Sequence, residues 1–421
     1  MNENFEIRQE RAVLVGLNAD CFTKEQTATE QTLEELDALL QTAGGFCVGK
    51  ILQNRHTPDS HSFIGEGKAI EVKLLAEATE ATMVIFDNEL SPGNIRALEE
   101  IIGLPVLDRS ALILDIFAQR AKTKEGRLQV ELAQYKYLLP RLAGLGKHLS
   151  RQGGGIGTRG PGETKLESDR RHIRQRIDRL NDELAQVRQV RGVQRRQRMK
   201  NSVPVVAIVG YTNAGKSTLL NTLTGAGIPA NNRLFDTLDT TSRQLQVSDN
   251  LEVILSDTVG FIAKLPHHLV DAFRATLEEL EYADLLLHVI DSADPDRQEH
   301  IEVVEKLVAK LAKPGTGVLQ CYNKADLVSP EDIPIGEDVV AMSAKTGQGT
   351  QELLAAIERM LGHSRHRVKL TIPYTMGALV ETLHSGAQVL GVDYTADGIE
   401  IEAIVDPILY GRVKEYITKE L

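Results

Sequence analysis

Residues 210–217 read Gly-Tyr-Thr-Asn-Ala-Gly-Lys-Ser, which fits the pattern G-x-x-x-x-G-K-S. The run before it, 203–209, is short, apolar and β-branched, and the run after it, 218–223, carries apolar residues at helical spacing. A strand, a glycine-rich loop and a helix in this order predict a phosphate-binding loop, whose backbone N–H groups and helix N-terminus face the phosphates. Lys216 is expected to neutralise the β- and γ-phosphates, and the Ser217 hydroxyl to hold Mg²⁺.

The composition limits the classes of protein that this chain can represent. Its 421 residues are 42% hydrophobic and 25% charged, as in globular proteins. This length predicts roughly two to four domains. The net charge of −11 argues against a basic nucleic-acid coat, and the 4% content of aromatic residues, with no Trp, argues against a surface that stacks on bases. We expect no DNA partner.

The sequence carries no signal for export or for membrane insertion. Its three cysteines, Cys21, Cys47 and Cys321, are widely spaced and form no C-x-x-C pair, so neither a disulfide framework nor a zinc site is expected. The acidic N-terminus lacks the apolar core of a signal peptide, and no apolar run reaches the roughly 18–20 residues that cross a bilayer. We expect a cytoplasmic monomer without stable membrane insertion, partly membrane-associated at most.

Residues 1–108 alternate strand and helix patterns, which predicts an N-terminal α/β domain with a mostly parallel sheet. The predicted strands and helices, in chain order, are 12–17, 29–43, 46–52, 68–78, 82–86, 94–102 and 105–107. The turn Gly65-Glu66-Gly67-Lys68 is too short for a dinucleotide fingerprint. It leaves two interpretations open, an ordinary turn before a helix or a contact to phosphate or RNA.

Residues 109–200 predict a helical hairpin of two long helices, 109–139 and 164–200, with Pro140 ending or kinking the first. Each helix has apolar residues at steps of three and four. These residues are Leu128, Leu132, Tyr135 and Leu138 in the first helix, and Ile173, Ile177, Leu180, Leu184 and Val187 in the second. Two such seams that face each other make an antiparallel coiled coil.

The loop that joins these helices, 144–162, contains eight glycines in nineteen residues and offers few side chains to bury. From 144 to 200, fifteen Lys and Arg stand against six Asp and Glu. A solvated helix face is the ordinary interpretation of such a charge run. The arginine bias and the glycine-rich tip favour contact with the backbone of structured RNA instead. The expected contact residues are Lys147, Arg151, Gly153, Gly154, Gly155, Arg159, Arg170 and Arg171.

Residues 201–362 carry further nucleotide motifs. The strand 251–255 runs into Ser256-Asp257-Thr258-Val259-Gly260, which places a carboxylate to order Mg²⁺ through a water and the Gly260 N–H to sense a γ-phosphate. The motif Asn323-Lys324-Ala325-Asp326 follows the strand 318–322. Its Asp carboxylate can accept the N1–H and N2–H₂ of guanine, donors that adenine lacks. Ser343-Ala344-Lys345 would close over the base from the other side.

The last segment, 363–421, predicts a small α+β domain. Its expected strands and helices, in chain order, are 367–372, 376–384, 399–404 and 407–416. It contains no catalytic constellation.

The five motifs from the glycine loop to Ser-Ala-Lys occur in the order and spacing of a Ras-like GTPase, over about 160 residues. The glycine-rich loop that runs into 163–167 (Glu-Thr-Lys-Leu-Glu), the hairpin and the GTPase domain placed after both resemble the HflX family of bacterial ribosome-associated GTPases. This resemblance covers nearly the whole chain. It implies a GTP-binding enzyme that contacts the 50S subunit and its 23S rRNA near the peptidyl-transferase centre and splits stalled or idle 70S ribosomes.

Carried onto this sequence, the resemblance implies the residues that bind GTP or GDP. The phosphate loop supplies Gly210, Tyr211, Thr212, Asn213, Ala214, Gly215, Lys216 and Ser217. The two switches supply Phe235, Asp236, Thr237, Leu238 and Asp239, and then Asp257, Thr258, Val259 and Gly260. The base is read by Asn323, Lys324, Ala325 and Asp326, with support from Ser343, Ala344 and Lys345.

The resemblance also assigns Mg²⁺ and the chemistry. Mg²⁺ would be ligated by Ser217 and Thr237, and by Asp257 through a water. Lys216, Thr237 and Gly260 would serve catalysis. The neighbouring residues at 240 and 241 are also threonines, but position 237 is favoured because F-x-T-L matches the related Obg-type switch.

Phe261 follows Gly260 at the position where Ras itself has a catalytic Gln. A phenyl ring cannot orient water, so intrinsic hydrolysis should be slow. His267 or His268 could substitute. Asn213 is a candidate K⁺ ligand, because similar loops with Asn here, as in the tRNA-modifying GTPase TrmE, hold K⁺ in place of an arginine finger.

Three other functions stay open at this stage. The chain could be a GTPase of large-subunit assembly that does not dissociate 70S particles. It could be an RNA-remodelling protein that uses ATP in its N-terminal domain, with a regulatory GTPase domain; the turn at 65–68 is the sole support for this. It could regulate a membrane protease, which no sequence feature specifically supports.

Overall fold

The computed structural model describes residues 9–24, 26–142, 165–200, 203–225, 234–235, 241–248, 251–258, 260–264, 280–362, 366–396, 398–405 and 407–420. The chain forms two compact units. The first consists of Met1–Ala185, Asn231–Asp239 and Ile262–Arg274. The second consists of Gln186–Ala230, Thr240–Phe261 and Ala275–Leu421.

The first unit is built on a four-stranded parallel sheet of order β2-β1-β3-β4. The strands are β1 (Arg11–Ala19), β2 (Phe46–Arg55), β3 (Met83–Phe86) and β4 (Val106–Asp108). The helices between them are α1 (Glu30–Ala43), α2 (Glu66–Ala78) and α3 (Pro92–Ile102). The central β1 is buried along nearly its whole length, as expected of a parallel strand covered on both faces. The predicted parallel α/β arrangement is confirmed.

The turn at 65–68 opens α2. Gly65 adopts a left-handed φ of 82° at the helix N-cap, and Lys68 forms an ion pair with Glu71 at 2.5 Å. Lys68 is therefore paired within its own helix, which supports the interpretation as an ordinary turn before a helix.

The single helix expected over 109–139 is wrong, because two helices occupy this stretch. They are α4 (Arg109–Arg120) and α5 (Lys124–Leu142), and Pro140 lies inside α5. The backbone is extended at Ala121, and the Thr123 hydroxyl then accepts the Gly126 N–H at 2.9 Å, which caps the new helix. Helix α4 packs on α1 with apolar residues all around it, so it belongs to the N-terminal core.

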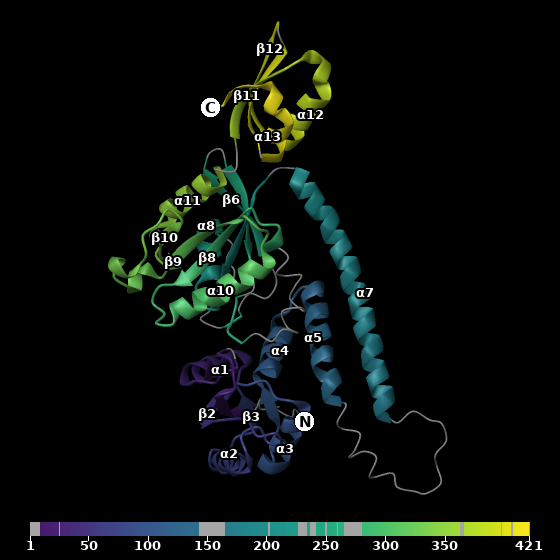
Figure 1. The fold of residues 1–421 in the computed structure, drawn as a ribbon, viewed down its shortest axis with the longest axis vertical. Helices are drawn as coiled ribbons and strands as arrows, with labels where there is room; N and C mark the ends of the chain where they lie inside the picture. The colour runs from purple at the N-terminus through teal and green to yellow at the C-terminus, as the bar shows by residue number, and fades with distance from the viewer. Residues whose placement is uncertain are drawn as a thin grey trace, which may run out of the picture. The chain divides into compact units, whose positions relative to one another are not determined.

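The second predicted helix is α7 (Lys165–Lys200), which Figure 1 shows beside α5. Leu180 and Leu184 are buried, and Arg176 forms a two-pronged hydrogen bond with Glu131 of α5 at 2.9 and 3.0 Å. The seam predicted on the first helix is partly wrong. Leu138 is 44% exposed, whereas its neighbour Tyr137 is buried. Tyr137 turns inward because its hydroxyl donates to Asp108 at 2.8 Å.

The second unit contains a six-stranded sheet of order β10-β9-β8-β5-β7-β6. Its strands are β5 (Val205–Gly210), β6 (Thr241–Ser248), β7 (Leu251–Asp257), β8 (Leu285–Asp291), β9 (Gly317–Asn323) and β10 (Val339–Ala341). Helices α8 (Lys216–Thr224) and α11 (Thr350–Gly362) pack on one face, and α10 (Arg297–Leu311) packs on the other. Only β6 is antiparallel, and the sequence reading did not predict it. The fold is a Ras-like doubly wound sheet.

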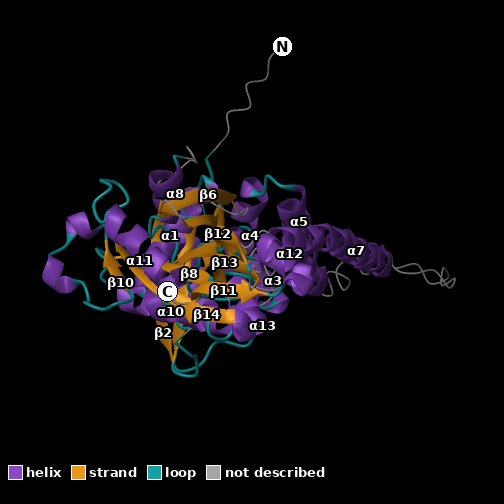
Figure 2. Ribbon diagram, turned by 90° about the horizontal axis from the view of Figure 1, so that it is seen from above, coloured by secondary structure: helices purple, strands orange, loops and turns teal. Residues whose placement is uncertain are grey.

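The C-terminal segment forms a four-stranded antiparallel sheet of order β12-β13-β11-β14, visible in Figure 2 among the orange strands. The strands are β11 (His366–Ile372), β12 (Gln388–Thr395), β13 (Gly398–Val405) and β14 (Ile417–Glu420). Helices α12 (Gly377–Gly386) and α13 (Pro407–Val413) cover its apolar face with Leu383, Leu409 and Val413. Strands β11 and β13 were predicted, but β12 and β14 were not.

Short 3-10 turns complete the described chain: Ala325–Leu327, Pro330–Asp332, Tyr374–Met376 and Lys414–Tyr416. Among the described helices, none is long and apolar enough to cross a membrane.

Candidate nucleotide-binding site

The loop 210–217 joins β5 to α8, and two of its glycines are required by close approaches. A Cβ on Gly210 (φ 153°) would lie 2.3 Å from the Val289 carbonyl oxygen. A Cβ on Gly215 (φ 95°) would lie 2.2 Å from Asn323 Nδ2. Because both glycines also have φ values that other residues rarely adopt, their presence is dictated by the loop's path.

Lys216 lies in the first turn of α8 with its side chain folded under the loop. It is 6% exposed, and its Nζ donates to the carbonyl oxygens of Gly210 at 3.0 Å and Tyr211 at 2.6 Å. Burial lowers the pKa of Lys216 to about 8, although the Asp257 carboxylate opposes the shift. Within the described part of the chain this ammonium group forms no ion pair, so it suits an anionic ligand.

Oxygen donors converge next to this lysine. Strands β5 and β7 are paired so that Ile208 lies opposite Asp257, and this register brings Asp257 Oδ2 to 3.5 Å from Ser217 Oγ. The neighbouring Thr258 is fixed because its hydroxyl donates to the Ile208 carbonyl oxygen at 2.7 Å. A hydroxyl and a buried carboxylate at this separation are the donor types that Mg²⁺ prefers.

Phe261 lies against the phosphate loop. Its N–H donates to the Gly210 carbonyl oxygen at 3.1 Å, and its own carbonyl oxygen accepts the Thr212 N–H at 2.7 Å. The side chain is 3% exposed. It is held as a strand-like neighbour of Tyr211 and presents no polar atom to a water.

Asn323 fastens the phosphate loop to the segment 343–345. Its Nδ2 donates to the Ala214 carbonyl oxygen at 2.8 Å, and its Oδ1 accepts the Ala344 N–H at 2.8 Å. The following Lys324 has φ 60° and pairs with Asp291 of β8 at 2.5 Å. The structure thus brings the separate motifs at 210–217, 257–260, 323–326 and 343–345 to the carboxyl ends of neighbouring strands.

Two base-facing candidates remain open to solvent. Asp326 and Lys345 are exposed, whereas Ser343 and Ala344 are buried behind them. The exposed carboxylate of Asp326 is a suitable acceptor for a base that presents paired N–H donors.

Comparison with known proteins identifies the family. Residues 30–118 match the family model described as GTP-binding GTPase N-terminal, residues 120–198 match GTP-binding GTPase Middle Region, and residues 205–324 match 50S ribosome-binding GTPase. The GTPase HflX of Caldanaerobacter subterraneus is 48% identical over 97% of this chain and 94% of its own length. That of Escherichia coli K12 is 46% identical over 86% and 85%, respectively.

The chain belongs to the HflX family of GTPases. It is an enzyme that hydrolyses GTP to GDP and phosphate, with the Ras-like fold that its sequence predicts. A solved structure described as the crystal structure of SsGBP and GDP complex is 26% identical, covers 84% of this chain and 99% of its own, and has a TM-score of 0.49.

Several expected site residues of this HflX chain lie outside the described residues. They are Asp236, Thr237, Leu238, Asp239, Val259, His267 and His268 of the switches, and Lys147, Arg151, Gly153, Gly154, Gly155 and Arg159 of the glycine-rich loop. Of the remaining predicted RNA contacts, Arg171 is exposed and Arg170 is half-buried on α7. Asn213 is exposed and has a left-handed φ of 63°.

The described part of the first switch packs within the first compact unit. The ring of Phe235 meets that of Phe117 in α4 edge to face, with centroids 4.7 Å apart. The Leu234 N–H donates to Thr42 Oγ1 of α1 at 3.3 Å. Phe235 is 3% exposed, so this residue of the predicted first switch is part of an apolar contact with the N-terminal helices.

Ala263 and Lys264, which lie between the predicted second switch at 257–260 and His267, join a buried ion cluster in the same unit. Lys264 pairs with Asp87, which also binds Arg109 Nη1 at 2.8 Å, and Arg109 in turn pairs with Glu35. Arg109 Nη2 also donates to the Ala263 carbonyl oxygen at 3.3 Å. Burial lowers the pKa of Lys264, and Asp87 partly opposes this shift. Sequence reasoning missed this cluster, because its members are spread over some 230 positions and form no motif.

Proposed function

We propose that this chain is a GTP-driven switch that binds the large (50S) ribosomal subunit through its N-terminal domain and helical hairpin and splits stalled or idle 70S ribosomes. The observation that carries this proposal lies within one compact unit: Phe235 of the predicted first switch meets Phe117 of α4, and Lys264, just after the predicted second switch, pairs with Asp87 at the end of β3. Segments that would respond to the γ-phosphate would thereby act directly on the domain that would meet the ribosome.

The proposed chemistry is in-line attack of a water on the γ-phosphate, with GDP as the leaving group. Lys216 and the N–H groups of the phosphate loop and of Gly260 would stabilise the charge on the phosphate oxygens. Phe261 contributes no group that orients the water. Hydrolysis is therefore slow until a residue of the second switch or a ribosomal contact supplies one.

The guanine would be read at the other end of the site. Asp326 would accept its N1–H and N2–H₂, Lys324 and Ala325 would flank it, and Ser343–Lys345 would close over it. Asn323 would read the base as well, because its Nδ2 has a second N–H besides the one that donates to Ala214, while its Oδ1 accepts the Ala344 N–H. In this arrangement Asn323 holds the phosphate and base halves of the site at a fixed separation.

Ser217 and Thr237 would ligate Mg²⁺, and Asp257, whose Oδ2 lies 3.5 Å from Ser217 Oγ, would hold the ion through a water. When bound, the ion neutralises charge on the β- and γ-phosphate oxygens. We further propose K⁺ as a second cation at Asn213. The expected RNA contacts are the basic and glycine residues of the hairpin, including Arg170 and Arg171, and the expected partner is 23S rRNA. The protein would act as a cytoplasmic monomer.

Sucrose-gradient sedimentation of 70S ribosomes tests this proposal. The full chain should convert 70S particles into subunits with a non-hydrolysable GTP analogue and not with GDP. Absence of ribosome binding in every nucleotide state would end the proposal. Binding to immature large subunits without 70S dissociation would identify an assembly GTPase instead.

A variant at Lys264 tests the contact with the N-terminal domain on which this proposal rests. Lys264→Met removes the cation that pairs with Asp87 but leaves the Asp87–Arg109 pair, so the N-terminal domain should stay folded. We expect splitting to decline while GDP affinity is unchanged. The matched control, Lys369→Met, breaks a surface pair with Glu400 in the C-terminal sheet and should behave as the parent does.

A further inference from the structure

The ring of Tyr211, the second residue of the phosphate loop, stacks on a side chain that lies outside the loop. It stacks on the imidazole of His300 in the first turns of α10, with centroids 3.6 Å apart and an interplanar angle of 11°. Tyr211 is 7% exposed and the His300 side chain 24%. The two rings therefore exclude water from most of each other's faces.

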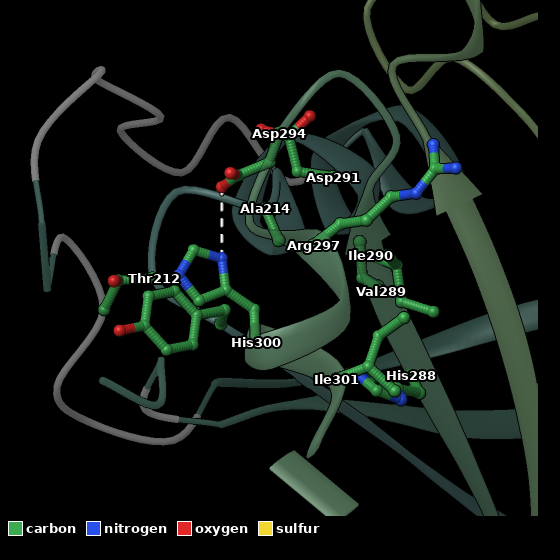
Figure 3. A pocket seen from close by; sticks show the side chains of 11 residues that line it. Thr212, Ala214, His288, Val289, Ile290, Asp291, Asp294, Arg297, His300 and Ile301 are labelled. Carbon is green, nitrogen blue, oxygen red and sulfur yellow. Dashed lines mark ion pairs between the residues drawn. The ribbon is translucent and has the colours of Figure 1, made fainter. Parts of the chain in front are cut away.

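The imidazole is in turn held by Asp294. The His300 Nδ1 lies 3.1 Å from Asp294 Oδ2, the ion pair drawn as a dashed line in Figure 3. The other carboxylate oxygen of Asp294 accepts the Asp296 N–H at 2.9 Å, which fixes the carboxylate on its own loop. The hydrogen bond from His300 lowers the pKa of Asp294. The ring plane of His300 is thus set from two sides, by a stack and by an ion pair.

The same β8–α10 loop also holds the guanine-reading motif. Asp291 pairs with Lys324 at 2.5 Å, and the Ser292 N–H donates to the Asn323 carbonyl oxygen at 2.9 Å. Figure 3 shows Asp291 and Asp294 close together on this loop. Residues 291–300 therefore contact the phosphate half of the site through His300 and the base half through Asp291.

The position of Tyr211 affects the lysine beneath it. The Tyr211 carbonyl oxygen accepts the Lys216 Nζ at 2.6 Å, and the backbone on either side of Tyr211 is hydrogen-bonded to Phe261. Contacts thus run from Asp294 through His300 and Tyr211 to Lys216. A loop held in its binding conformation before the ligand arrives loses less conformational freedom on binding.

We propose that His300, oriented by Asp294, is a positioning residue that keeps the phosphate loop preorganised and thereby sets the affinity for guanine nucleotides. In this proposal His300 acts through Tyr211 and makes no contact of its own with the nucleotide. His300 should affect nucleotide affinity rather than kcat, because Tyr211 and Lys216 would contact the phosphates equally in the ground state and during hydrolysis. Loss of the stack should therefore accelerate nucleotide release and leave the turnover of bound GTP nearly unchanged.

The test compares three full-length variants by stopped-flow release of a fluorescent GDP and by steady-state GTP hydrolysis. His300→Ala removes the stack and should raise the Kd for GDP about two- to tenfold, with kcat within about twofold of the parent. His300→Phe keeps a ring over Tyr211 and should restore most of the affinity. The matched control, His366→Ala, removes a similar stack on Tyr410 in the C-terminal domain (4.1 Å, 29°) and should leave the Kd unchanged.

A parent-like Kd for His300→Ala overturns the proposal. So does a fall in kcat at unchanged Kd, or equal weakening by Ala and Phe. Thermal unfolding of each variant separates a local effect from loss of the fold. Should His300→Ala fail to fold, Asp294→Asn retains the ring but removes the charge that orients it. It should raise the Kd by about 1.5- to fivefold, and an unchanged value would sink the idea.

Discussion

At the scale of single residues, the buried ammonium of Lys216 dominates the nucleotide site. Its two hydrogen bonds go to backbone carbonyls, and the attraction of the Asp257 carboxylate offsets only part of the loss of hydration, so its pKa falls to about 8 in the absence of ligand. Phosphate groups favour the charged form. Nucleotide binding should therefore raise this pKa again and take up a proton.

This linkage predicts a measurable proton uptake. At pH 8.5 binding of GDP should take up about 0.8 proton, and at pH 7 about 0.1 proton, because the free lysine is mostly neutral only above its pKa. Affinity should correspondingly fall as the pH rises from 8 towards 9. Isothermal titration calorimetry in buffers of different ionisation enthalpy measures the uptake. Equal heats in all buffers at pH 8.5 would contradict the assigned environment.

Gly215 gives a second prediction at this scale. Gly215→Ala places a methyl group on Asn323 Nδ2 and forces a left-handed φ, which together should cost about 1–3 kcal/mol and weaken GDP binding at least fivefold. Gly225→Ala is the matched control. Gly225 has φ 64° but open space around its missing Cβ, so it reports backbone strain without the clash. Equal GDP affinities for the two variants would rule out the role assigned to the Gly215–Asn323 contact.

Asn213 gives a third prediction at the scale of single residues. It is exposed on the phosphate loop and Phe261 offers no polar group, so a cation is a reasonable source of the missing positive charge. We expect GTP turnover to be faster in KCl than in NaCl at equal ionic strength, and Asn213→Ala to abolish the difference. Equal rates in the two salts for the unmodified chain would remove K⁺ from the mechanism.

At the scale of elements, the long helix α7 depends on its contact with α5. Its buried positions are few, whereas most of its remaining described side chains are charged or polar and exposed. A helix of this composition gains its stability from packing one face rather than from propensity alone. Leu180 and Leu184 are the side chains of its described part that are nearly inaccessible to solvent.

Leu180→Ala should therefore destabilise the hairpin by about 2–5 kcal/mol. We expect faster amide hydrogen exchange in α5 and α7 and little change in β5–β10, measured by mass spectrometry on the full chain. The control is Arg179→Ala, an exposed neighbour on the same helix whose removal should cost less than about 0.5 kcal/mol. Unchanged exchange in Leu180→Ala would show that the hairpin does not rely on this seam.

At the scale of the whole molecule, the proposed switch needs a sensor and an effector. The sensor is the nucleotide site, and the effector is the N-terminal domain with its basic hairpin. We expect deletion of 153–162 to abolish ribosome splitting while leaving GDP affinity and basal hydrolysis intact. If splitting persists after this deletion, the loop serves only as a linker. Replacement of the same ten residues by a Gly-Ser sequence separates loop length from loop chemistry.

Much of the fold could be read from the sequence because its signals are local. Alternating apolar strands and amphipathic helices identified the parallel α/β unit, and the glycine loop, Asp257–Gly260 and Asn323–Asp326 identified the Ras-like domain by order and spacing. The elements that the sequence analysis did not predict were missed for physical reasons. The polar edge strand β6 and the C-terminal strands β12 and β14 lack a strong apolar pattern, and the break between α4 and α5 carries no Gly or Pro.

By itself the sequence determined the nucleotide and the fold class, because phosphate and guanine recognition require particular residue types at fixed spacing along one chain. Only the tertiary structure decided which side chains contact the site and hold it in position. Lys264 meets Asp87, and His300 meets Tyr211, across separations in the sequence that no short motif spans. Such contacts depend on the register of strands and the packing of helices. The phosphate loop at 210–217 is therefore recognisable from its own residues, but what holds it in shape is not.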